Sequence, residues 1–388
     1  MINPVNFMII YIKTICCYYG TFIIFYYNRG GNIMIISDNN DFSVNNVLTH
    51  TKKRQPDFNN LIKVLNRKVP DRPTLFEFFM NGRIYSELTG IDFAEIYNDR
   101  QKYNDGLISA FRNAGYDYAT IPAPFTFPLK AHAANKSFSQ NETVMIQDQK
   151  SFDEYPWPDI AEIDFTYLDN VGKSLFPGMK AILYGPGGVL ENTTMILGYE
   201  NMCYLIYDDP GLVEDVFGRV GNILYDYYDR IADHKCAGAL IVNDDWGYRT
   251  QTLLGIDDMR KYVIPWHKAI TDRIHTAGKP AILHSCGQLK DVMEDIIGYI
   301  GYDAKHSYED AIMPVEEFYE DNKGRIAVCG GIDLDYVCTR SPKEVFDRSA
   351  AMLKRAEKSG GYALGTGNSV PEYVPSTNYY AMLLAALS

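Results

Sequence analysis

From residue 57 onward, short apolar runs alternate with longer segments whose apolar residues recur at helical spacing. This alternation is typical of βα units, which build a parallel sheet covered by helices. Eight runs have the length and composition of buried strands. They are residues 73–78, 118–124, 181–188, 238–247, 280–287, 302–310, 325–333 and 361–369. The fold class predicted is α/β, a single (β/α)8 TIM-type barrel over residues 57–388.

Four of the intervening helices are well marked, at residues 210–232, 257–277, 290–300 and 341–359. The last begins Ser-Pro-Lys-Glu, which places a cap, a first-turn proline and a glutamate at the helix start. A doubly wound open sheet is the structural alternative. No Gly-x-Gly-x-x-Gly follows a predicted strand, and the Gly-Pro-Gly-Gly at 185–188 lacks that spacing. A dinucleotide site is therefore not expected.

The N-terminal region differs from the rest of the chain. Residues 6–27 are apolar apart from Lys13 and are long enough to span a bilayer, but they lack the features of a signal peptide. Three interpretations stay open for residues 1–33: an over-extended start upstream of Met34, a membrane anchor, or the leader of an exported precursor. Residues 34–56 are expected to form a polar linker before the barrel.

Charge and cysteine content restrict the partners and the compartment. The chain has 49 acidic and 37 basic residues, a formal net charge of −12, and no basic run. This balance argues against a nucleic-acid surface, and a membrane partner is expected only if residues 6–27 are an anchor. The seven cysteines are an odd number scattered over a long chain. This pattern indicates a reducing compartment, and the location expected is cytoplasmic.

The C-terminal ends of barrel strands carry active sites, and the sharpest candidate there is His284-Ser285-Cys286. Alternate residues of a strand share a face, so His284 and Cys286 are expected to project together. An imidazole and a thiolate suit a tetrahedral zinc site. The alternative is a buried histidine and cysteine that only pack.

A third zinc ligand is sought on neighbouring strand ends. His306 ranks first because polar residues follow it, and Cys329 ranks second because it precedes a Gly-Gly turn. Carboxylates rank third, and they are Glu77, Asp244 and Asp245. Either His306 or Cys329 could instead be packing.

Other polar and aromatic residues at strand ends are candidates for catalysis and substrate binding. Asp244 and Asp245 are expected to contact substrate, a proton or metal, with helix capping as the alternative. Tyr308, a catalytic candidate, could also line an aromatic pocket with Trp246 and Tyr248, unless these three rings only pack. Asn368 lies in a glycine-rich turn that could approach a ligand.

Several segments in a constant order carry a family resemblance. They are PDRPTLFEF, LYGPGGVLENTTMILGYENMCYLIYDDPGLV, DDWG, IPWHKAI, HSCG, GGID and GTGNSVPEYVP. Together, over residues 51–387, they resemble the uroporphyrinogen decarboxylase superfamily. The resemblance implies a (β/α)8 barrel. It also implies one of two activities, decarboxylation or zinc- and corrinoid-dependent methyl transfer.

Departures from the decarboxylase pattern favour the methyltransferase branch. Decarboxylases carry an Arg-Gln-Ala-Gly-Arg loop after the first strand, where this chain offers only Arg83. They also carry Gly-His-Gly at the last strand, where Thr366 replaces the histidine. The His-x-Cys of the methyltransferases is present, but their later cysteine is absent at that turn. The sequence is most similar to the demethylase-type members.

The function expected from the resemblance is zinc-dependent methyl transfer between a small methylated substrate, such as a methoxylated aromatic, and cobalamin on a partner corrinoid protein. His284 and Cys286 would hold the zinc with a third ligand. The alternatives are a uroporphyrinogen decarboxylase and a barrel that binds a tetrapyrrole or corrinoid without turnover.

Overall fold

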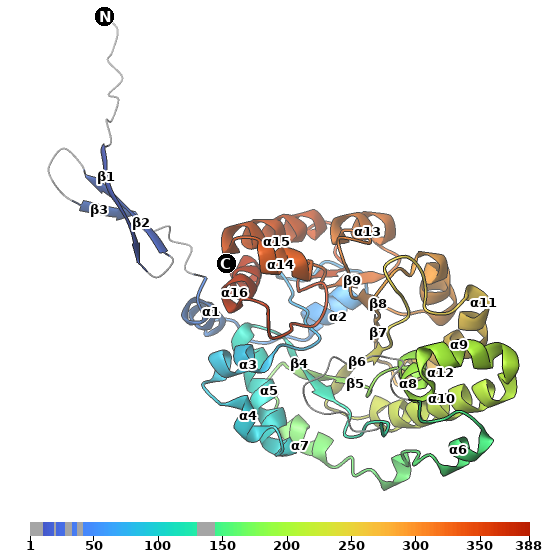
Figure 1. Cartoon of the computed structure of the whole chain (residues 1–388). Coiled ribbons are helices and arrows are strands. Elements are labelled where there is room, and N and C mark those ends of the chain that lie inside the picture. Colours follow the sequence, from blue (N-terminus) through green and yellow to red (C-terminus); the bar gives the residue numbers. More distant parts are fainter. Residues whose placement is uncertain (1–10, 19–20, 28–32, 37–41, 130–143) are drawn as a thin grey trace, which may run out of the picture.

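The computed structural model describes residues 11–18, 21–27, 33–36, 42–129 and 144–388. Its centre is a curved, seven-stranded parallel sheet in the order β10-β9-β8-β7-β6-β5-β4 (Figure 1). The strands are β4 (Tyr118–Pro122), β5 (Lys180–Tyr184), β6 (Ala237–Asn243), β7 (Ala281–His284), β8 (Ala304–His306), β9 (Ala327–Cys329) and β10 (Tyr362–Ala363). Each strand pairs with the next strand of the sheet along the chain, as expected when a helical crossover joins each pair.

The first predicted strand, residues 73–78, is not a regular strand. It makes a single parallel bridge, from Leu75 to Leu364 of the segment after β10. On its other side, the Tyr118 hydroxyl bonds both the backbone N–H and the carbonyl of Glu77, at 2.6 and 2.8 Å. This side chain occupies backbone groups that a ladder with β4 would use. The described part of the chain therefore has an α/β fold with seven hydrogen-bonded strands rather than the predicted eight, and its curved parallel sheet is consistent with a TIM-type barrel.

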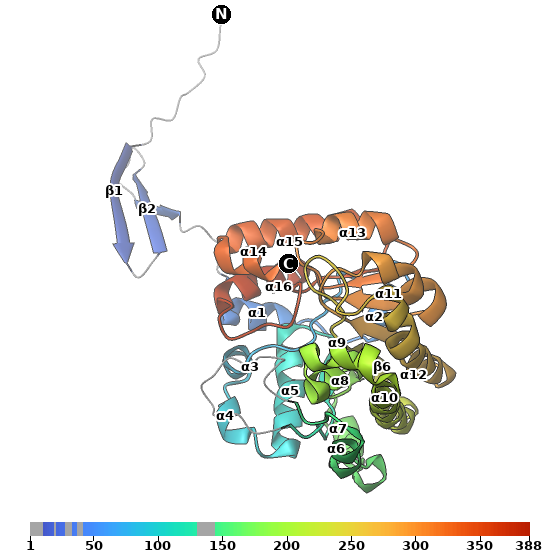
Figure 2. The same ribbon diagram turned by 45° about the vertical axis from the view of Figure 1, so that its right-hand side comes forward.

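Helices cover the outside of the sheet (Figures 1 and 2). Before β6 they are α1 (Val44–Thr51), α2 (Asn59–Leu65), α3 (Gly82–Thr89), α4 (Phe93–Ile96), α5 (Arg100–Ala114), α6 (Gln149–Glu154), η1 (Ile160–Glu162), α7 (Tyr167–Ser174), α8 (Val189–Leu197), α9 (Tyr199–Asp208) and α10 (Pro210–Ala232). After β6 they are α11 (Ile256–Asp258), η2 (Met259–Val263), α12 (Ile264–Thr276), η3 (Lys290–Val292), η4 (Asp295–Ile300), α13 (Val315–Asn322), α14 (Leu334–Thr339), α15 (Pro342–Ala356) and α16 (Ser376–Leu387).

Two of the predicted helices begin where their capping residues indicate. Helix α10 has the predicted bounds, and the Asp209 side chain accepts a hydrogen bond from the N–H of Leu212 at 3.1 Å. Helix α15 begins with a capping box between Ser341 and Glu344, as the sequence predicts. Residues 257–277 instead form two helices joined by the wide turn η2. Pro265 has no N–H to donate to the carbonyl four residues earlier, so the regular ladder cannot continue there.

The N-terminal region contains a separate antiparallel sheet of β1 (Tyr11–Tyr18), β2 (Thr21–Tyr27) and β3 (Ile33–Ile36), which lies apart from the barrel in Figure 1. Among the described residues, no helix has the length and apolar character needed to cross a membrane. Residues 1–10, 28–32 and 37–41, parts of the expected leader and linker, lie outside the described residues. Helix α1 falls in the expected linker, yet its Val47 is fully buried.

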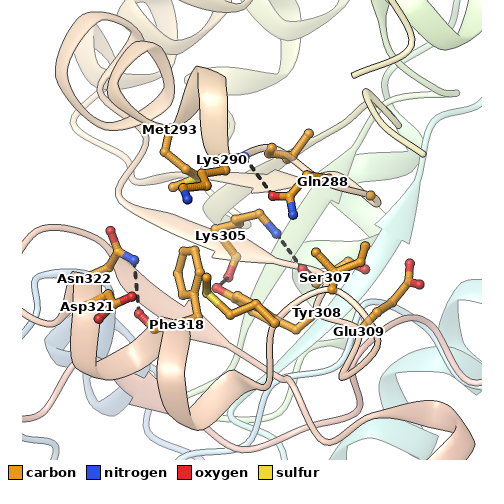
Figure 3. Close-up of a pocket in the computed structure, with 14 residues that line it drawn as sticks. Gln288, Lys290, Met293, Lys305, Ser307, Tyr308, Glu309, Phe318, Asp321 and Asn322 are labelled. Carbon is orange, nitrogen blue, oxygen red and sulfur yellow. Dashed lines mark hydrogen bonds between the residues drawn. The ribbon is translucent and has the colours of Figure 1, made fainter. Parts of the chain in front are cut away.

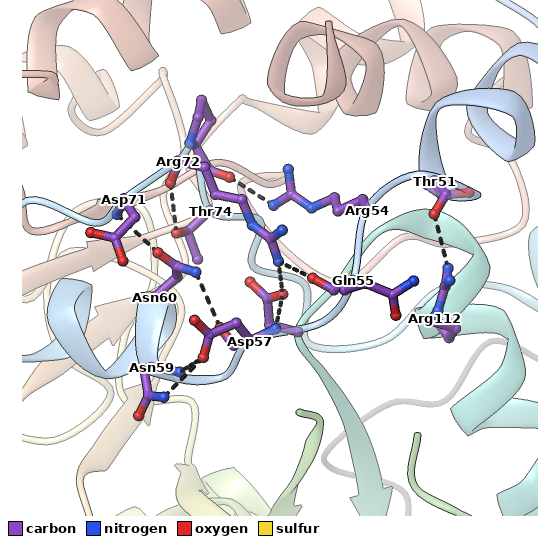
Figure 4. Close-up of polar contacts among 12 residues, drawn as sticks. Thr51, Arg54, Gln55, Asp57, Asn59, Asn60, Asp71, Arg72, Thr74 and Arg112 are labelled. Atoms are coloured by element: carbon purple, nitrogen blue, oxygen red, sulfur yellow. Dashed lines mark hydrogen bonds and ion pairs between the residues drawn. The ribbon is translucent and has the colours of Figure 1, made fainter. Parts of the chain in front are cut away.

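A polar network holds the segment before residue 57 against the underside of the sheet (Figure 4). Asp117, which directly precedes β4, accepts hydrogen bonds from Arg72 at 2.5 Å and from the N–H of Asp57 at 2.8 Å. Arg54 donates to the carbonyl of Pro73 at 2.7 Å. Residues before 57 are therefore fastened to the barrel, at the end of the strands opposite to the candidate site.

Candidate functional site

A pocket of ≈ 810 Å³ opens at the C-terminal ends of the strands. One part of its lining is aromatic and comprises Phe78, Phe79, Phe127 and Tyr184. Another part is polar and includes Asp245, His284 and Asn368. We call this cavity the mouth pocket. Its position is the one that active sites occupy in this class of barrel.

Three potential metal ligands gather beside the mouth pocket. One ligand atom each of Asp245, His284 and Cys286 lie within 4.8 Å of one another. Asp245 follows the end of β6, whereas His284 ends β7 and Cys286 lies two residues later. The structure thus brings His284 and Cys286 together, as the two-residue spacing predicts, and adds Asp245. We call these residues the Asp-His-Cys cluster.

The surroundings of Cys286 suit a sulfur anion. The Asn368 side-chain amide donates to Sγ at 3.1 Å, and the Ser307 hydroxyl lies 3.5 Å from it. Without a cation, burial and the charge of Asp245 raise the pKa of the Cys286 thiol to about 12. A bound metal reverses this balance, because a coordinating thiol is deprotonated. Asn368 and Ser307 therefore supply polar contacts to the sulfur, and a cation is still required to stabilise the thiolate.

His284 is held as a neutral imidazole. Burial, followed by the effects of His306 and Lys305, lowers its pKa well below the usual range. Its Nδ1 lies 2.7 Å from Nδ1 of His306, so Nε2 is the nitrogen left for a metal ion. A neutral imidazole is the form that binds metals.

His306 and Cys329 lie outside the Asp-His-Cys cluster. Both side chains are fully buried, and burial lowers the pKa of His306 to about 3 and raises that of Cys329. The second nitrogen of His306, Nε2, lies 3.2 Å from the carbonyl oxygen of Thr366. Both nitrogens of His306 are thus engaged within the protein. The geometry favours Asp245, from the group ranked third by sequence, as the third ligand.

The donors of the cluster fit a zinc ion. Imidazole nitrogen, thiolate sulfur and carboxylate oxygen are all zinc ligands in proteins. Three protein ligands with a fourth position open are the pattern of catalytic zinc sites, whereas structural sites are closed by four protein ligands. The adjoining mouth pocket would give a substrate access to that fourth position.

Asp244 differs from its neighbour Asp245. Its fully buried carboxylate accepts hydrogen bonds from two backbone N–H groups at the start of α8, from the Trp246 indole at 3.0 Å, and contacts His267 at 2.8 Å. A Cβ at Gly188 would lie 2.0 Å from Asp244 Cβ, so the helix start needs glycine there. Asp244 therefore caps the start of α8, which is the alternative role given for it from the sequence. Both of its carboxylate oxygens are engaged in these contacts.

The predicted aromatic residues do not line the mouth pocket. Trp246 is fully buried against Asp244 and His267, and Tyr248 is half exposed and packs edge-on against Tyr199. Tyr308 lies beside a different pocket, of ≈ 200 Å³, between the loop after β7 and α13 (Figure 3). The Lys305 ammonium lies 4.4 Å from the centre of its ring. The sequence could not show which face of each strand end these rings occupy.

Four aromatic residues and one acid of the mouth pocket were missed. Phe78 ends the first apolar run, Phe79 follows it and Tyr184 ends β5, so their places at strand ends were the available signal. Glu191, on α8, lines the same pocket. Burial, reinforced by the charges of Asp245 and Asp244, raises the pKa of Glu191 to about 8. Its carboxyl therefore carries a proton at neutral pH.

The family follows from a match over most of the sequence. Residues 57–387 match the family model described as uroporphyrinogen decarboxylase (URO-D). The chain belongs to the URO-D family. This match agrees with the resemblance of the sequence motifs and with the curved parallel sheet. No curated protein matches the chain by sequence.

Solved structures add a comparison at the level of the fold. The URO-D chain is similar to a methyltransferase from Methanosarcina mazei, with a TM-score of 0.67 and 13% identity, over 84% of this chain and 97% of that one. A weaker similarity, with a TM-score of 0.42 and 11% identity, relates it to a β-glycosidase from Thermosphaera aggregans, over 82% of this chain and 96% of that one.

Proposed function

We propose that this URO-D family member is a zinc-dependent methyltransferase that moves a methyl group between a small methylated substrate and cobalamin on a partner corrinoid protein. The observation that carries the proposal is the Asp-His-Cys cluster beside the mouth pocket. The similarity to a methyltransferase fold agrees with it.

Each part of the site has a role in this proposal. His284, Cys286 and Asp245 would hold the zinc, which when bound supplies a Lewis acid for the heteroatom that carries the methyl group. The aromatic lining gives flat apolar walls that exclude water and fit a methoxylated ring. Glu191 carries a proton at neutral pH and would donate it to the departing oxygen. Reduced cobalamin would accept the methyl group.

The decarboxylase alternative needs cations that the site does not offer. A substrate with many carboxylates is bound by arginines or lysines. None lines the mouth pocket among the residues that the structure describes. Arg83 donates instead to the carbonyl of Val374 at 2.6 Å. This contact ties Arg83 to the segment before α16, away from the substrate.

Metal analysis and an anaerobic assay test the proposal together. We expect about one zinc per chain, lost in Cys286→Ser and kept in Cys338→Ser, a matched change at a half-buried cysteine of α14. Methoxylated, methylthio and methylamine donors would be offered with reduced cobalamin, and uroporphyrinogen in parallel. Methylcobalamin formed by the wild type and not by Cys286→Ser supports the proposal. Coproporphyrinogen formation would establish the decarboxylase, and zinc-free, inactive protein that binds a corrinoid would establish the binding barrel.

A further inference from the structure

A chain of polar contacts runs through the barrel interior to the Asp-His-Cys cluster. It begins at Glu77, whose carboxyl accepts from the Thr366 hydroxyl at 2.8 Å. The Thr366 carbonyl lies 3.2 Å from Nε2 of His306, and Nδ1 of His306 lies 2.7 Å from Nδ1 of His284. All four side chains are buried. Apart from His284, none of them belongs to the cluster.

The direction of this chain follows from donor and acceptor chemistry. A carbonyl oxygen only accepts, so the contact with Thr366 requires the proton of His306 on Nε2. A neutral imidazole carries one proton, which leaves Nδ1 of His306 as an acceptor. Nδ1 of His284 must then be the donor. The remaining nitrogen of His284, Nε2, has a free lone pair.

We propose that His306 is a positioning residue that selects the Nδ1–H tautomer of His284 and so directs the Nε2 lone pair to the metal ion. This inference deepens the proposed function and rests on it for the metal. It gives His306 a role different from that of a ligand. A partner of this kind fixes both the tautomer and the ring orientation of a metal-binding histidine.

Packing holds the rings of His306 and His284 in place. We call the chain of contacts from Glu77 through Thr366 and His306 to His284 the relay. The ring centroids of Phe76 and His306 are 5.2 Å apart, and those of Phe78 and His284 are 4.5 Å apart. A Cβ at Gly330 would lie 2.8 Å from Cδ2 of His306 and 2.3 Å from the Thr366 carbonyl oxygen. The φ of +74° at Gly330 also favours glycine. The space around the relay is therefore filled, and neither ring can turn without displacing a neighbour.

Two substitutions at His306 separate positioning from ligation. His306→Gln keeps an acceptor for His284 and a donor for Thr366, whereas His306→Phe keeps a planar ring without either. Cys329→Ala, a change at an equally buried strand residue, is the control for loss of packing. Zinc affinity is measured for all three by competition with a chromophoric chelator. We expect His306→Phe to bind zinc about 10–100-fold more weakly, and His306→Gln to stay close to the wild type.

The tautomer itself is read without metal or substrate, from two-bond ¹H–¹⁵N correlations of the histidine rings. We expect the Nδ1–H form of His284 in the wild type and in His306→Gln, and the Nε2–H form in His306→Phe. An Nε2–H form in the metal-free wild type would overturn the proposal, even if His306→Phe does not fold. Loss of zinc by orders of magnitude in His306→Gln would show that His306 is a ligand instead. Correct tautomers and zinc affinities without methyl transfer would refute the proposed function alone.

Discussion

Asp245 accepts the backbone N–H of Cys286 at 3.0 Å, which joins the loop after β6 to the loop after β7. The same carboxylate contributes an oxygen to the Asp-His-Cys cluster. Asp245 therefore shapes the loop that presents the sulfur and also stands beside the sulfur as a candidate ligand. Substitutions can separate these two roles.

Asp245→Asn preserves an oxygen that accepts the Cys286 N–H but removes the anionic ligand. We expect zinc affinity to fall by at least tenfold with little change in thermal stability, because the loop contact persists. Asp245→Ala removes both the anionic ligand and the acceptor for the Cys286 N–H. We therefore also expect a loss of stability of about 1–3 kcal/mol, because this N–H is left without a partner. Chelator competition and thermal unfolding measure the two effects. If Asp245→Asn binds zinc as the wild type does, Asp245 is not a zinc ligand.

Zinc affinity should increase with pH. Burial and Asp245 raise the pKa of Cys286 to about 12, so between pH 6 and 8 the metal must displace the thiol proton. Release of one proton corresponds to an affinity about tenfold higher per pH unit. His284 adds nothing to this slope because burial keeps it neutral. Competition titrations at pH 6, 7 and 8 measure the slope, and a pH-independent affinity would contradict binding through the Cys286 thiolate.

Glu77 should make the fold less stable at alkaline pH. Burial raises its pKa to about 8, so the folded protein holds a proton that the unfolded chain releases near the ordinary pKa of glutamate. Stability from this group therefore falls as pH rises from the ordinary pKa to about 8. We expect Glu77→Gln to exceed the wild type in free energy of unfolding by a few kcal/mol (~1.4 per pKa unit) at pH 9, but not at pH 4. Glu317→Gln, on the surface of α13, is the control, and a constant difference across pH would refute the assignment.

The two parts of the N-terminal region should respond differently to truncation. A protein starting at Met34 is expected to fold and act as the full chain does, because it retains α1 and the network around Asp117. Deletion of residues 1–56 removes buried Val47 and the Arg54 contact with Pro73, and should cost several kcal/mol. Thermal unfolding compares the three forms. Retention of the full chain in membranes after a high-salt wash would show that the leader is an anchor.

Much of the fold was predictable because local signals determine it. Helix α10 followed from its cap and its apolar face, and the order of the sheet followed from the alternation of strands and helices. The irregularity of the predicted first strand, residues 73–78, could not be foreseen, because the Tyr118 hydroxyl, 41 residues away in sequence, bonds the backbone groups of Glu77 that would pair with β4. The wide turn at η2 had a visible cause in Pro265, but the sequence does not specify how a helix accommodates a proline.

The candidate site was predictable only where residues share one strand. The spacing of His284 and Cys286 placed them on one face, and the structure brings them together. Adjacency of strands also placed His306 beside His284, but it did not distinguish a metal ligand from a hydrogen-bond partner of one. Likewise, Asp244 and Asp245 are equivalent in sequence, and only the position of α8 decides which of them is buried.

Residues 73–78 pair with the sheet on one side only, through the bridge from Leu75 to Leu364. Their other side, toward β4, has no ladder in the part of the chain that the structure describes, and we call this gap in the ring of strands the seam. Between residues 73–78 and β4, the Tyr118 hydroxyl stands in for a ladder among the described residues. The seam lies beside Glu77, and therefore at one end of the relay that reaches His284. Local opening of the barrel should begin there, so the Glu77 amide, which donates to the Tyr118 hydroxyl, should exchange its hydrogen faster than the amides of β5 and β6. Thr366 contacts Glu77 through its hydroxyl and His306 through its carbonyl, so opening of the seam would loosen the residue that holds His306 against the candidate ligand His284.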